Sequence, residues 1–256
     1  MKVISVFNQK GGVGKTTTNI NLAAYLAVNG HKVLIIDIDP QGNSTSGLGI
    51  DKKKVEISSY HLLTDDISLE EAMIKSELIE NLYIVPSTIE LAGAEIEMID
   101  IKNREKILRE KVNKNDQNFE FVFIDCPPSL GLLTLNALSA STSVLIPIQC
   151  EYYALEGVSQ LVNTIQLVKK SLNKELSVEG VILTMYDNRT KLCNEVSVEV
   201  KKYFGDKVFE STIPRNIRLA EAPSFGLPIM LYDDKCKGAE SYEDLTKEFI
   251  KRQEVK

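Results

Sequence analysis

Apolar residues occur in several short, uninterrupted runs, separated by stretches in which apolar and polar residues mix. Uninterrupted runs rich in β-branched residues are typical of strands that are covered on both faces, as in a parallel sheet. We therefore expect a buried, mostly parallel sheet. The expected strands are residues 3–7, 33–36, 121–124, 144–148 and 181–183, with residues 82–86 as a further candidate.

The stretches between these runs carry apolar residues at helical spacing. Two sets each fall on one helical face, the first after the first expected strand and the second after residues 144–148. The sets are Ile20, Ala23, Ala24 and Ala27, and Leu155, Val158, Leu161, Val162, Ile165 and Val168. Strands that alternate with helices predict a doubly wound α/β fold, with right-handed crossovers and helices on both faces of the sheet. Residues 51–80 are polar and weakly patterned, so we expect loops and short helices there.

A glycine-rich loop joins the first expected strand to the first expected helix. Glycines allow a tight turn in which successive N–H groups face an anion, and the following helix adds its positive end. Lys15 can then reach the β- and γ-phosphates of a nucleotide, and the Thr16 hydroxyl can bind Mg²⁺. The expected ATP-binding residues of the loop are Lys10, Gly11, Gly12, Val13, Gly14, Lys15, Thr16 and Thr17.

The loop departs from the general phosphate-loop pattern near its start. The pattern places a glycine where this chain has Gln9, and here a second lysine, Lys10, precedes the glycines. Two lysines this close repel each other unless more negative charge is bound, so we expect Lys10 to serve a nucleotide too, one in a partner subunit being a candidate. A dinucleotide-binding loop fits less well, because Thr17 replaces its last glycine and Lys15 would have no role.

Two expected strands end in acidic residues, one at Asp37 and Asp39 and the other at Asp125. The carboxyl ends of parallel strands face the same crevice as the phosphate loop. A carboxylate there can hold Mg²⁺ through coordinated water, a role we assign to Asp125, and Asp39 is the candidate for positioning the attacking water. The expected residues of the Mg²⁺ site are therefore Thr16, Asp39 and Asp125. For Asp37, support of the metal or loop and capping of a helix both stand as interpretations.

The composition fits one domain and narrows the possible environments. A chain of 256 residues with 43% hydrophobic residues can bury one sizeable core, so we expect a single domain over residues 1–256. No apolar stretch reaches the roughly 20 residues of a membrane span, and no signal peptide is evident, which favours the cytoplasm. The four cysteines are scattered without metal-site spacing, which favours reduced structural thiols.

The net charge of −6 argues against a protein that is basic all over. From Thr184 onward, however, 13 basic residues balance 13 acidic ones, so the net charge of −6 comes entirely from the first 183 residues. Contact with nucleic acid is therefore expected in the last third of the chain.

Five motifs together resemble the ParA/Soj type of partition ATPase, within the deviant Walker A class that also contains MinD. They lie at residues 10–17, 37–43, 125–131, 151–157 and 213–224 and span nearly the whole chain. The double-lysine loop marks the class, and the later motifs favour the ParA branch. Plasmid relatives carry an extra N-terminal DNA-binding domain, whereas here the loop begins almost at residue 1. The chain therefore resembles the short chromosomal form, without a separate N-terminal DNA-binding domain.

The resemblance implies an ATPase that uses ATP and Mg²⁺ and forms a sandwich homodimer when ATP binds. The dimer would bind double-stranded DNA without reading its sequence, which implies association with the nucleoid. A ParB/Spo0J-type centromere-binding protein would then stimulate hydrolysis and so release the DNA. No membrane contact is implied.

The same resemblance assigns roles to individual residues. Lys10 would reach the nucleotide of the partner subunit, Lys15 would hold phosphate within its own subunit, and Asp39 would be needed for hydrolysis. These three are the expected catalytic residues. The remaining matches are Pro214, Arg215 and Asn216 at the adenine edge and Arg189 and Arg218 on DNA.

Three other functions compete with this interpretation. A MinD-like membrane ATPase would need an amphipathic C-terminal anchor, but residues 242–253 carry acidic side chains and little aromatic bulk, which favours a helix docked on the domain. A nitrogenase-reductase-like electron carrier would need paired cysteines, a pattern that Cys126 and Cys150 do not match. A scaffold that binds nucleotide without hydrolysing it is disfavoured by the presence of Lys15 and Asp39.

Overall fold

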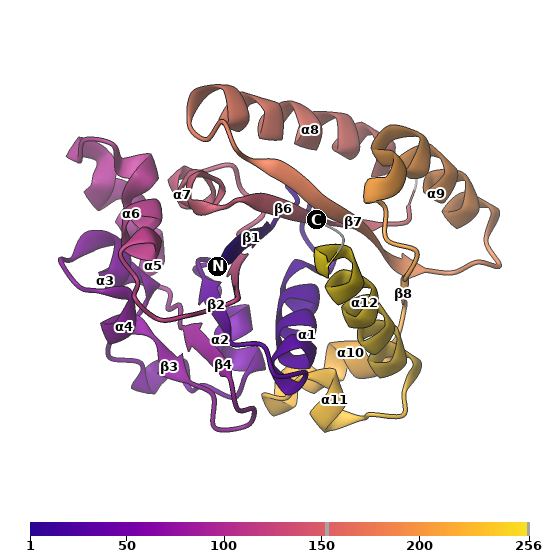
Figure 1. The fold of residues 1–256 in the computed structure, drawn as a ribbon, viewed down its shortest axis with the longest axis horizontal. Coiled ribbons are helices and arrows are strands. Elements are labelled where there is room, and N and C mark those ends of the chain that lie inside the picture. Colours follow the sequence, from indigo (N-terminus) through magenta and orange to yellow (C-terminus); the bar gives the residue numbers. More distant parts are fainter. Residues whose placement is uncertain (152–153, 255–256) are drawn as a thin grey trace.

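Strands and helices alternate along the chain in the computed structural model, which describes residues 1–151 and 154–254 (Figure 1). Within these residues one eight-stranded sheet has the order β3-β4-β2-β5-β1-β6-β7-β8. All neighbouring strands are parallel except β3, which is antiparallel to β4. The strands are β1 (Lys2–Val6), β2 (Val33–Asp37), β3 (Ile74–Lys75), β4 (Leu82–Val85), β5 (Phe121–Asp125), β6 (Ser143–Gln149), β7 (Ser177–Tyr186) and β8 (Ile213–Pro214).

The expected strands are all present, including the candidate at residues 82–86. Their first and last residues differ from those that the apolar runs predict. β7 extends well beyond residues 181–183, because its first residues are polar and only its middle is uninterruptedly apolar. The apolar pattern does not predict β3 and β8, which have two residues each and are too short to show a period. The polar region at residues 51–80 contains short helices as expected, together with β3.

Helices connect the strands. Those of the first half are α1 (Lys15–Val28), α2 (Asn43–Gly47), α3 (Ser59–Thr64), α4 (Leu69–Ala72), α5 (Leu91–Glu97) and α6 (Ile107–Asn113). Those of the second half are α7 (Leu132–Ala140), α8 (Ala154–Ser171), α9 (Lys191–Phe204), α10 (Ile217–Glu221), α11 (Ile229–Tyr232) and α12 (Lys237–Glu254). The two sets of apolar residues at helical spacing lie in α1 and α8 as expected. In the motif at residues 151–157, Tyr152 and Tyr153 lie outside the described residues.

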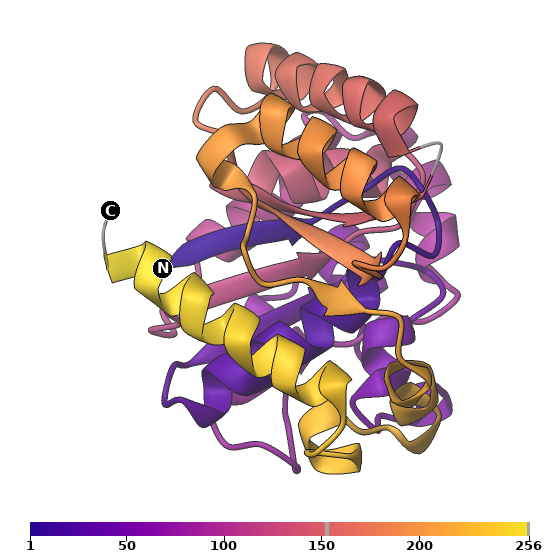
Figure 2. The same ribbon diagram turned by 90° about the vertical axis from the view of Figure 1, so that its right-hand side faces the viewer.

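Helices cover both faces of the sheet, which confirms the doubly wound α/β fold (Figures 1 and 2). Successive residues of a strand enter two different cores, as Val3 and Ile4 of β1 do. The first core packs against α3 to α9, and the second packs against α1 and α10 to α12. Fully buried aliphatic side chains such as Leu34 and Ile35 each stabilise the fold by about 1.5–3 kcal/mol.

The position of β1 in the middle of the sheet brings the predicted site together. β1 pairs with β5 on one side and β6 on the other, and β5 in turn pairs with β2. The register places Val6 and Asp37 each opposite Asp125. The loop that follows β1 and the acidic ends of β2 and β5 therefore meet at one edge of the sheet.

The C-terminal helix α12 lies along α1 on one face of the sheet (Figure 2). Tyr242, Leu245 and Phe249 are buried in the second core, so the expectation of a docked C-terminal helix is confirmed. None of the helices that the structure describes combines the length and the apolar character needed to cross a bilayer. All four cysteines are free thiols, and three of them are buried.

Candidate nucleotide site

The glycine-rich loop between β1 and α1 has a backbone conformation that favours glycine at two of its positions. Gly12 and Gly14 have φ values of 75° and 90°, in the left-handed region that other residues rarely adopt. Gly14 is the N-cap of α1, so the amino end of this helix opens directly into the loop. The positive end of the helix and the inward N–H groups of such a loop form a site for a phosphate.

Hydrogen bonds to β6 and β7 hold this loop in place. Asn8 donates from Nδ2 to the carbonyl of Pro147 in β6 at 2.8 Å, and its Oδ1 accepts from the N–H of Lys10 at 3.0 Å. On the other side, the Thr184 hydroxyl at the end of β7 donates to the carbonyl of Val13 at 2.8 Å. The loop is thus fixed to two strands before any ligand binds.

Lys15 lies inside the loop rather than in solvent. Its side chain is buried, and Nζ donates to the carbonyl of Lys10 at 3.1 Å. Burial lowers the pKa of Lys15, while the negative charges of Asp125 and Asp39 act in the opposite direction. The ammonium group of Lys15, which the backbone of the loop holds, lies where it can bind an anion that enters the loop.

Asp125 ends β5 and is fully buried beside the loop. One carboxylate oxygen, Oδ2, accepts from the Ser44 hydroxyl at 2.8 Å, and the Thr16 side chain also hydrogen-bonds this carboxylate. Burial raises the pKa of Asp125, and the hydrogen bonds from Ser44 and Thr16 oppose that rise. The other oxygen, Oδ1, is buried and has no hydrogen-bond partner among the described residues. A buried acceptor without a partner is unusual and fits a position that a metal-bound water completes.

Asp37 has a structural role that its position alone could not decide. Its Oδ2 accepts from the N–H and the hydroxyl of Thr45 at 2.9 and 2.7 Å, and its Oδ1 accepts from the N–H of Asp39 at 3.2 Å. These bonds tie the loop after β2 to the start of α2. The geometry therefore favours a structural role for Asp37, in which it holds the loop and accepts the N–H of Thr45 in the first turn of α2, over contact with the metal. Burial, and then the charge of Asp125, raise the pKa of Asp37.

Asp39 lies where the same loop passes the end of β4. It is 8% exposed, and its Oδ1 accepts from the N–H of Gln41 at 2.9 Å. The carbonyl of Asp39 accepts from the Ser87 hydroxyl at 2.8 Å, which anchors the loop to the chain after β4. The carboxylate is therefore held in place at the edge of the site, in a residue that is largely buried.

Lys10, the second lysine of the loop, lies further out than Lys15. Its side chain is 39% exposed, and its ammonium group forms an ion pair with Glu151 just after β6. Gly11 beside it is exposed, and a Cβ at this position would meet no atom within 4 Å. The outer side of the loop therefore has free space around it.

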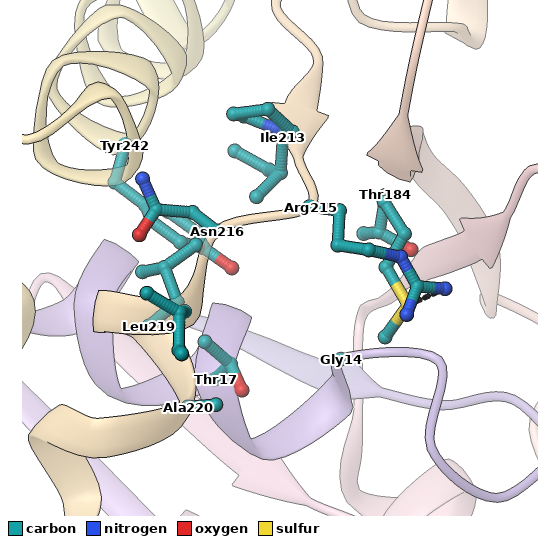
Figure 3. A pocket seen from close by; sticks show the side chains of 12 residues that line it. Gly14, Thr17, Thr184, Ile213, Arg215, Asn216, Leu219, Ala220 and Tyr242 are labelled. Carbon is teal, nitrogen blue, oxygen red and sulfur yellow. Dashed lines mark hydrogen bonds between the residues drawn. The ribbon is translucent and has the colours of Figure 1, made fainter.

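A cavity of about 380 Å³ opens next to the phosphate loop (Figure 3). Its residues come from the start of α1, the end of β7, the segment from β8 to α10, and α12. They are Gly14, Thr17, Thr184, Met185, Ile213, Pro214, Arg215, Asn216, Ile217, Leu219, Ala220 and Tyr242. The expected adenine contacts at residues 214–216 thus lie in one cavity with Gly14 and Thr17 of the loop.

The walls of this cavity are fixed by contacts between distant parts of the chain. The Tyr242 hydroxyl of α12 and the Thr18 hydroxyl of α1 share a buried hydrogen bond of 3.1 Å. Asn216 accepts from the N–H of Arg218 at 2.8 Å and so caps α10. A rigid, largely apolar cavity adjoining a phosphate loop suits the base and sugar of a nucleotide.

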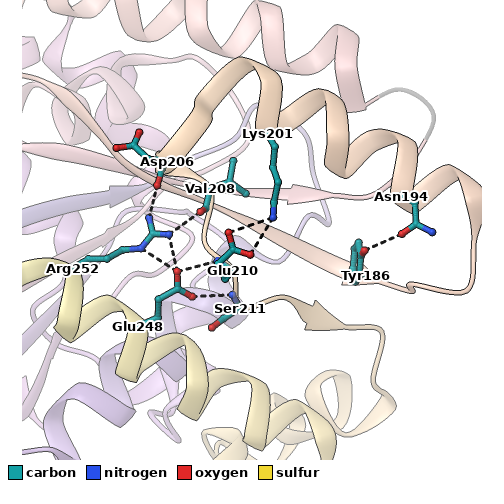
Figure 4. Close-up of polar contacts among 9 residues, drawn as sticks. All are labelled: Tyr186, Asn194, Lys201, Asp206, Val208, Glu210, Ser211, Glu248 and Arg252. Atoms are coloured by element: carbon teal, nitrogen blue, oxygen red, sulfur yellow. Dashed lines mark hydrogen bonds and ion pairs between the residues drawn. The ribbon is translucent and has the colours of Figure 1, made fainter.

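Helix α12 also holds the chain that leads into β8 (Figure 4). The carboxylate of Glu248 accepts from the N–H groups of Glu210 and Ser211 at 2.9 and 2.8 Å. Arg252 donates to the carbonyls of Asp206 and Val208, and its guanidinium lies 4.1 Å from the centre of the Phe209 ring. This network fixes the start of β8, and with it the cavity wall at residues 214–216.

The two arginines expected to contact DNA lie on separate elements, and each is paired with a carboxylate. Arg189 precedes α9, is 86% exposed, and forms a two-pronged contact with Asp187 at 2.9 and 2.8 Å. Arg218 on α10 pairs with Glu221 at 3.0 Å and Asp233 at 3.4 Å. Both arginines are accessible, but a DNA phosphate would have to compete with these carboxylates.

The structure contains site residues that the sequence analysis did not select. Ser44 and Thr45 bind the strand-end carboxylates, Thr184 holds the loop, and Met185 and Tyr242 line the cavity. Ser44 and Thr45 directly follow one of the five motifs, which was the available signal. The others had no local signal, because only the fold brings them to the site.

The residues present fit a magnesium ion that is held mainly by its nucleotide. Among the described residues no group of three or more His, Cys, Asp or Glu side chains could hold a metal. Mg²⁺ in nucleotide sites uses only one or two protein ligands, with phosphate oxygens and water completing the shell. The Thr16 hydroxyl and the unpartnered Oδ1 of Asp125 offer such a set.

The fold and the loop define a P-loop ATPase, and comparisons with known proteins give its family. A family model described as an AAA domain matches residues 1–178. The sporulation initiation inhibitor protein Soj of Bacillus subtilis is 59% identical over 247 residues, which cover 96% of this chain and 97% of that protein. The chromosome-partitioning ATPase Soj of Treponema pallidum is 49% identical, and the match covers 98% of both chains.

Among solved structures, a similar one is that of a cobyrinic acid a,c-diamide synthase from Mycobacterium smegmatis with a bound ATP analog and magnesium. It has a TM-score of 0.86 and 36% identity, covering 99% of this chain and 96% of that chain. The partition relatives are more alike in sequence. The chain belongs to the ParA/Soj family of chromosome-partitioning ATPases.

Proposed function

We propose that ATP joins two copies of this partition ATPase into a sandwich dimer that binds DNA without reading its sequence. Hydrolysis, stimulated by a ParB/Spo0J-type centromere-binding protein, then releases the DNA. The chain would act as one domain in the cytoplasm, associated with the nucleoid. The observation that carries the proposal is the position of Lys10 on the open outer side of the phosphate loop.

The position of Lys10 supports a contact across a dimer. Its ammonium group pairs with Glu151 instead of entering the loop beside Lys15, and its side chain is 39% exposed. A partly exposed ion pair contributes little free energy, on the order of 0–1 kcal/mol, so a phosphate from a second subunit can displace Glu151. Gly11 leaves room for the close approach of that subunit.

Within one subunit, the positions of the side chains support the proposed roles. Lys15 and the glycine backbone hold the phosphates, and Thr16 and Asp125 face the position of the metal. Mg²⁺, when bound with ATP, neutralises charge on the β- and γ-phosphates. Asp39 orients the attacking water, a role supported by its carboxylate being held by the N–H of Gln41 at the edge of the site.

The cavity on the other side of Gly14 receives the adenosine. Pro214, Arg215 and Asn216 form the side of this cavity that faces the base, and Thr17 lies at its junction with the phosphates. The two parts are contiguous, so one nucleotide can fill both.

DNA contact is assigned to Arg189 and Arg218. Contacts with phosphates need no base recognition, and their strength falls steeply as salt rises. Each subunit offers few such contacts, and both arginines must exchange a carboxylate for a phosphate. Joining two subunits doubles the contacts on one duplex, which makes DNA affinity depend on ATP.

The test is the fluorescence anisotropy of a labelled duplex of arbitrary sequence. Asp39→Ala protein, which should keep ATP bound, is titrated with ATP or ADP at low and moderate salt. We expect binding only with ATP, weaker binding at higher salt, and loss of binding in an additional Arg218→Glu variant. Lys170→Glu, a charge reversal at an exposed position on α8, is the matched control and should bind as before.

Two outcomes would count against the proposal. Equal binding with ATP and ADP would separate DNA affinity from the nucleotide state. Binding under no condition would favour the MinD-like alternative, which flotation of the ATP-bound protein with liposomes would then test.

A further inference from the structure

Met185, at the end of β7, has a backbone conformation that its side chain makes unfavourable. Its φ is 49°, in the left-handed region. The other described non-glycine residues with positive φ are Asn81 and Asn103, at 61° and 59°. Asparagine often adopts this conformation, because its short polar side chain can hydrogen-bond locally, whereas an unbranched apolar side chain has no such compensation. Glycine would be the favourable residue at position 185.

The conformation belongs to a bulge in the pairing of β7 with β8. Thr184 is opposite Ile213, and Tyr186 is opposite Pro214, so Met185 is the extra residue on β7. Bulges are rare in parallel pairs such as this one, and they are over-represented next to active sites, where they redirect a side chain. This bulge lies two residues before the loop that carries Arg189.

The effect of the bulge is visible in which residues line the base cavity. Successive residues of a regular strand point to opposite faces of the sheet. Thr184 and Met185 are successive, yet both line the same cavity beside Gly14. The unfavourable backbone therefore brings to the cavity a side chain that a regular strand would direct away from it.

We propose that the chain retains methionine here because its thioether packs against the purine base of the bound nucleotide. This inference rests on the base-binding role proposed above for the cavity. Sulfur is polarizable and makes favourable contacts with aromatic rings, which suits an apolar base site. Arg215, one of the expected adenine contacts, lies with Nη2 3.7 Å from the Met185 sulfur. The sulfur therefore also positions the guanidinium at the edge of the base.

A role in core packing alone does not explain the residue. Met185 is only partly buried, and it belongs to neither of the two cores. A side chain whose sole contribution was to fill the core would be buried. Its surroundings are instead the cavity and Arg215.

The test is Met185→Gly, which removes the side chain and at the same time relieves the backbone. Melting temperature without nucleotide, affinity for ATP with Mg²⁺, and affinity for inorganic tripolyphosphate with Mg²⁺ are measured in parallel. We expect a melting temperature equal to or above that of the wild type, because glycine favours this conformation. ATP affinity should fall by about 5- to 50-fold, and tripolyphosphate affinity should not change, because only the base contacts residue 185.

Two further variants separate the possible causes. Asn81→Gly makes the same backbone change outside the cavity lining and should leave both affinities unchanged. Met185→Leu keeps the apolar volume and should recover most of the ATP affinity, to within about threefold.

Three results would overturn the inference. These are unchanged ATP affinity in Met185→Gly, an equal loss of ATP and tripolyphosphate affinity, or a clearly lower melting temperature. If the wild type instead bound ATP no more tightly than tripolyphosphate, the base-binding role of the cavity itself would be wrong.

Discussion

The phosphate loop and the base cavity meet at Gly14 and Thr17, but they are assembled in different ways. The loop is a contiguous segment whose glycine backbone, Lys15 and helix end act together, and it is fixed by two neighbouring strands. The cavity instead combines the ends of β7 and β8 with α10 and α12. The phosphate loop thus depends on residues that are close in the sequence, and the base cavity depends on the packing of distant elements. Substitutions in the loop should therefore change binding or catalysis without unfolding. Changes in the contacts that hold the cavity wall should lower stability as well, whereas Met185→Gly, which relieves the backbone, should lower affinity alone.

The largest effect on nucleotide affinity is expected from Lys15→Ala on the phosphate side. Removing one partner of a buried, charged contact costs about 2–5 kcal/mol, so ATP affinity should fall at least about 30-fold. Affinity is measured by calorimetry with Mg²⁺ present. Lys174→Ala, at an exposed position before β7, is the control and should bind normally. Tight binding by Lys15→Ala would show that the backbone of the loop holds the phosphates unaided.

Asp39→Ala should separate binding from catalysis on the same side. Loss of a group that positions the attacking water should lower the rate of hydrolysis by about 10²–10⁴-fold, with ATP affinity nearly unchanged. Phosphate release and nucleotide affinity are measured on one preparation. Asp51→Ala removes a carboxylate that caps a short surface helix and should leave the rate unchanged. If Asp39→Ala hydrolysed ATP normally, Asp39 would not position the water.

Gly11→Val tests the free space on the outer side of the loop. A side chain at Gly11 meets no atom of its own subunit, and Gly11 has no left-handed backbone, so folding and ATP binding should be retained. Sedimentation velocity with ATP, in the Asp39→Ala background, should show a monomer where the parent variant forms a dimer. Gly11→Ala should give an intermediate result because it is smaller. An unchanged dimer in Gly11→Val would mean that the subunits do not approach closely at this loop.

The smallest effect is expected from Glu248→Gln, which acts on the cavity through the start of β8. Burial would raise the pKa of Glu248, but the N–H groups of Glu210 and Ser211 and the charge of Arg252 outweigh it, so the pKa lies below the ordinary 4.5. A carboxyl group whose pKa is lower in the folded state stabilises the fold above its unfolded pKa and loses this effect as pH falls through the folded value. The free energy of unfolding of Glu248→Gln should therefore be lower than that of the wild type by about 1–3 kcal/mol at pH 7.

That difference should shrink as the pH falls below 4.5, and urea unfolding at pH 7 and pH 4 measures it. ATP affinity at pH 7 should fall only slightly, because the phosphate loop is unaffected. Glu243→Gln, on the same helix but paired on the surface with Lys247, is the matched control and should change stability little. Equal losses in the two variants would show that the contact with the chain before β8 is not what stabilises α12.

The same contrast explains what could be predicted from the sequence. The uninterrupted apolar runs predict the central strands, because burial on both faces leaves a clear pattern. Lys15 and Thr16 could be chosen from local chemistry, since a strand, a glycine loop and a helix follow one another directly. Asp125 could be chosen because it is an acidic residue at the end of an apolar strand. Residues 214–216 were available only through the resemblance to a family, and Met185 and Tyr242 were not found. Their part in the cavity depends on a bulge and a distant helix, neither of which leaves a local pattern.

The ion pairs of Arg189 and Arg218 could not be foreseen for a related reason. Asp187 and Arg189 lie in the turn after β7, whose conformation leaves no periodic pattern in the sequence, and Asp233 reaches Arg218 only because the C-terminal end of α11 packs near α10. The counts of basic and acidic residues in the last third of the chain predict its net charge. They do not predict which charged side chains lie close together in space.

The central place of β1 has a consequence for how the protein is made. β1 leaves the ribosome first, but its partners β5 and β6 begin only at Phe121 and Ser143. Until those residues have been synthesised, an apolar strand remains unpaired, and such strands promote aggregation. The phosphate loop has no fixed shape until then either, because Asn8 needs the carbonyl of Pro147. We therefore expect the nascent chain to depend on chaperones until β5 and β6 have been synthesised, and to gain nucleotide affinity only after Pro147.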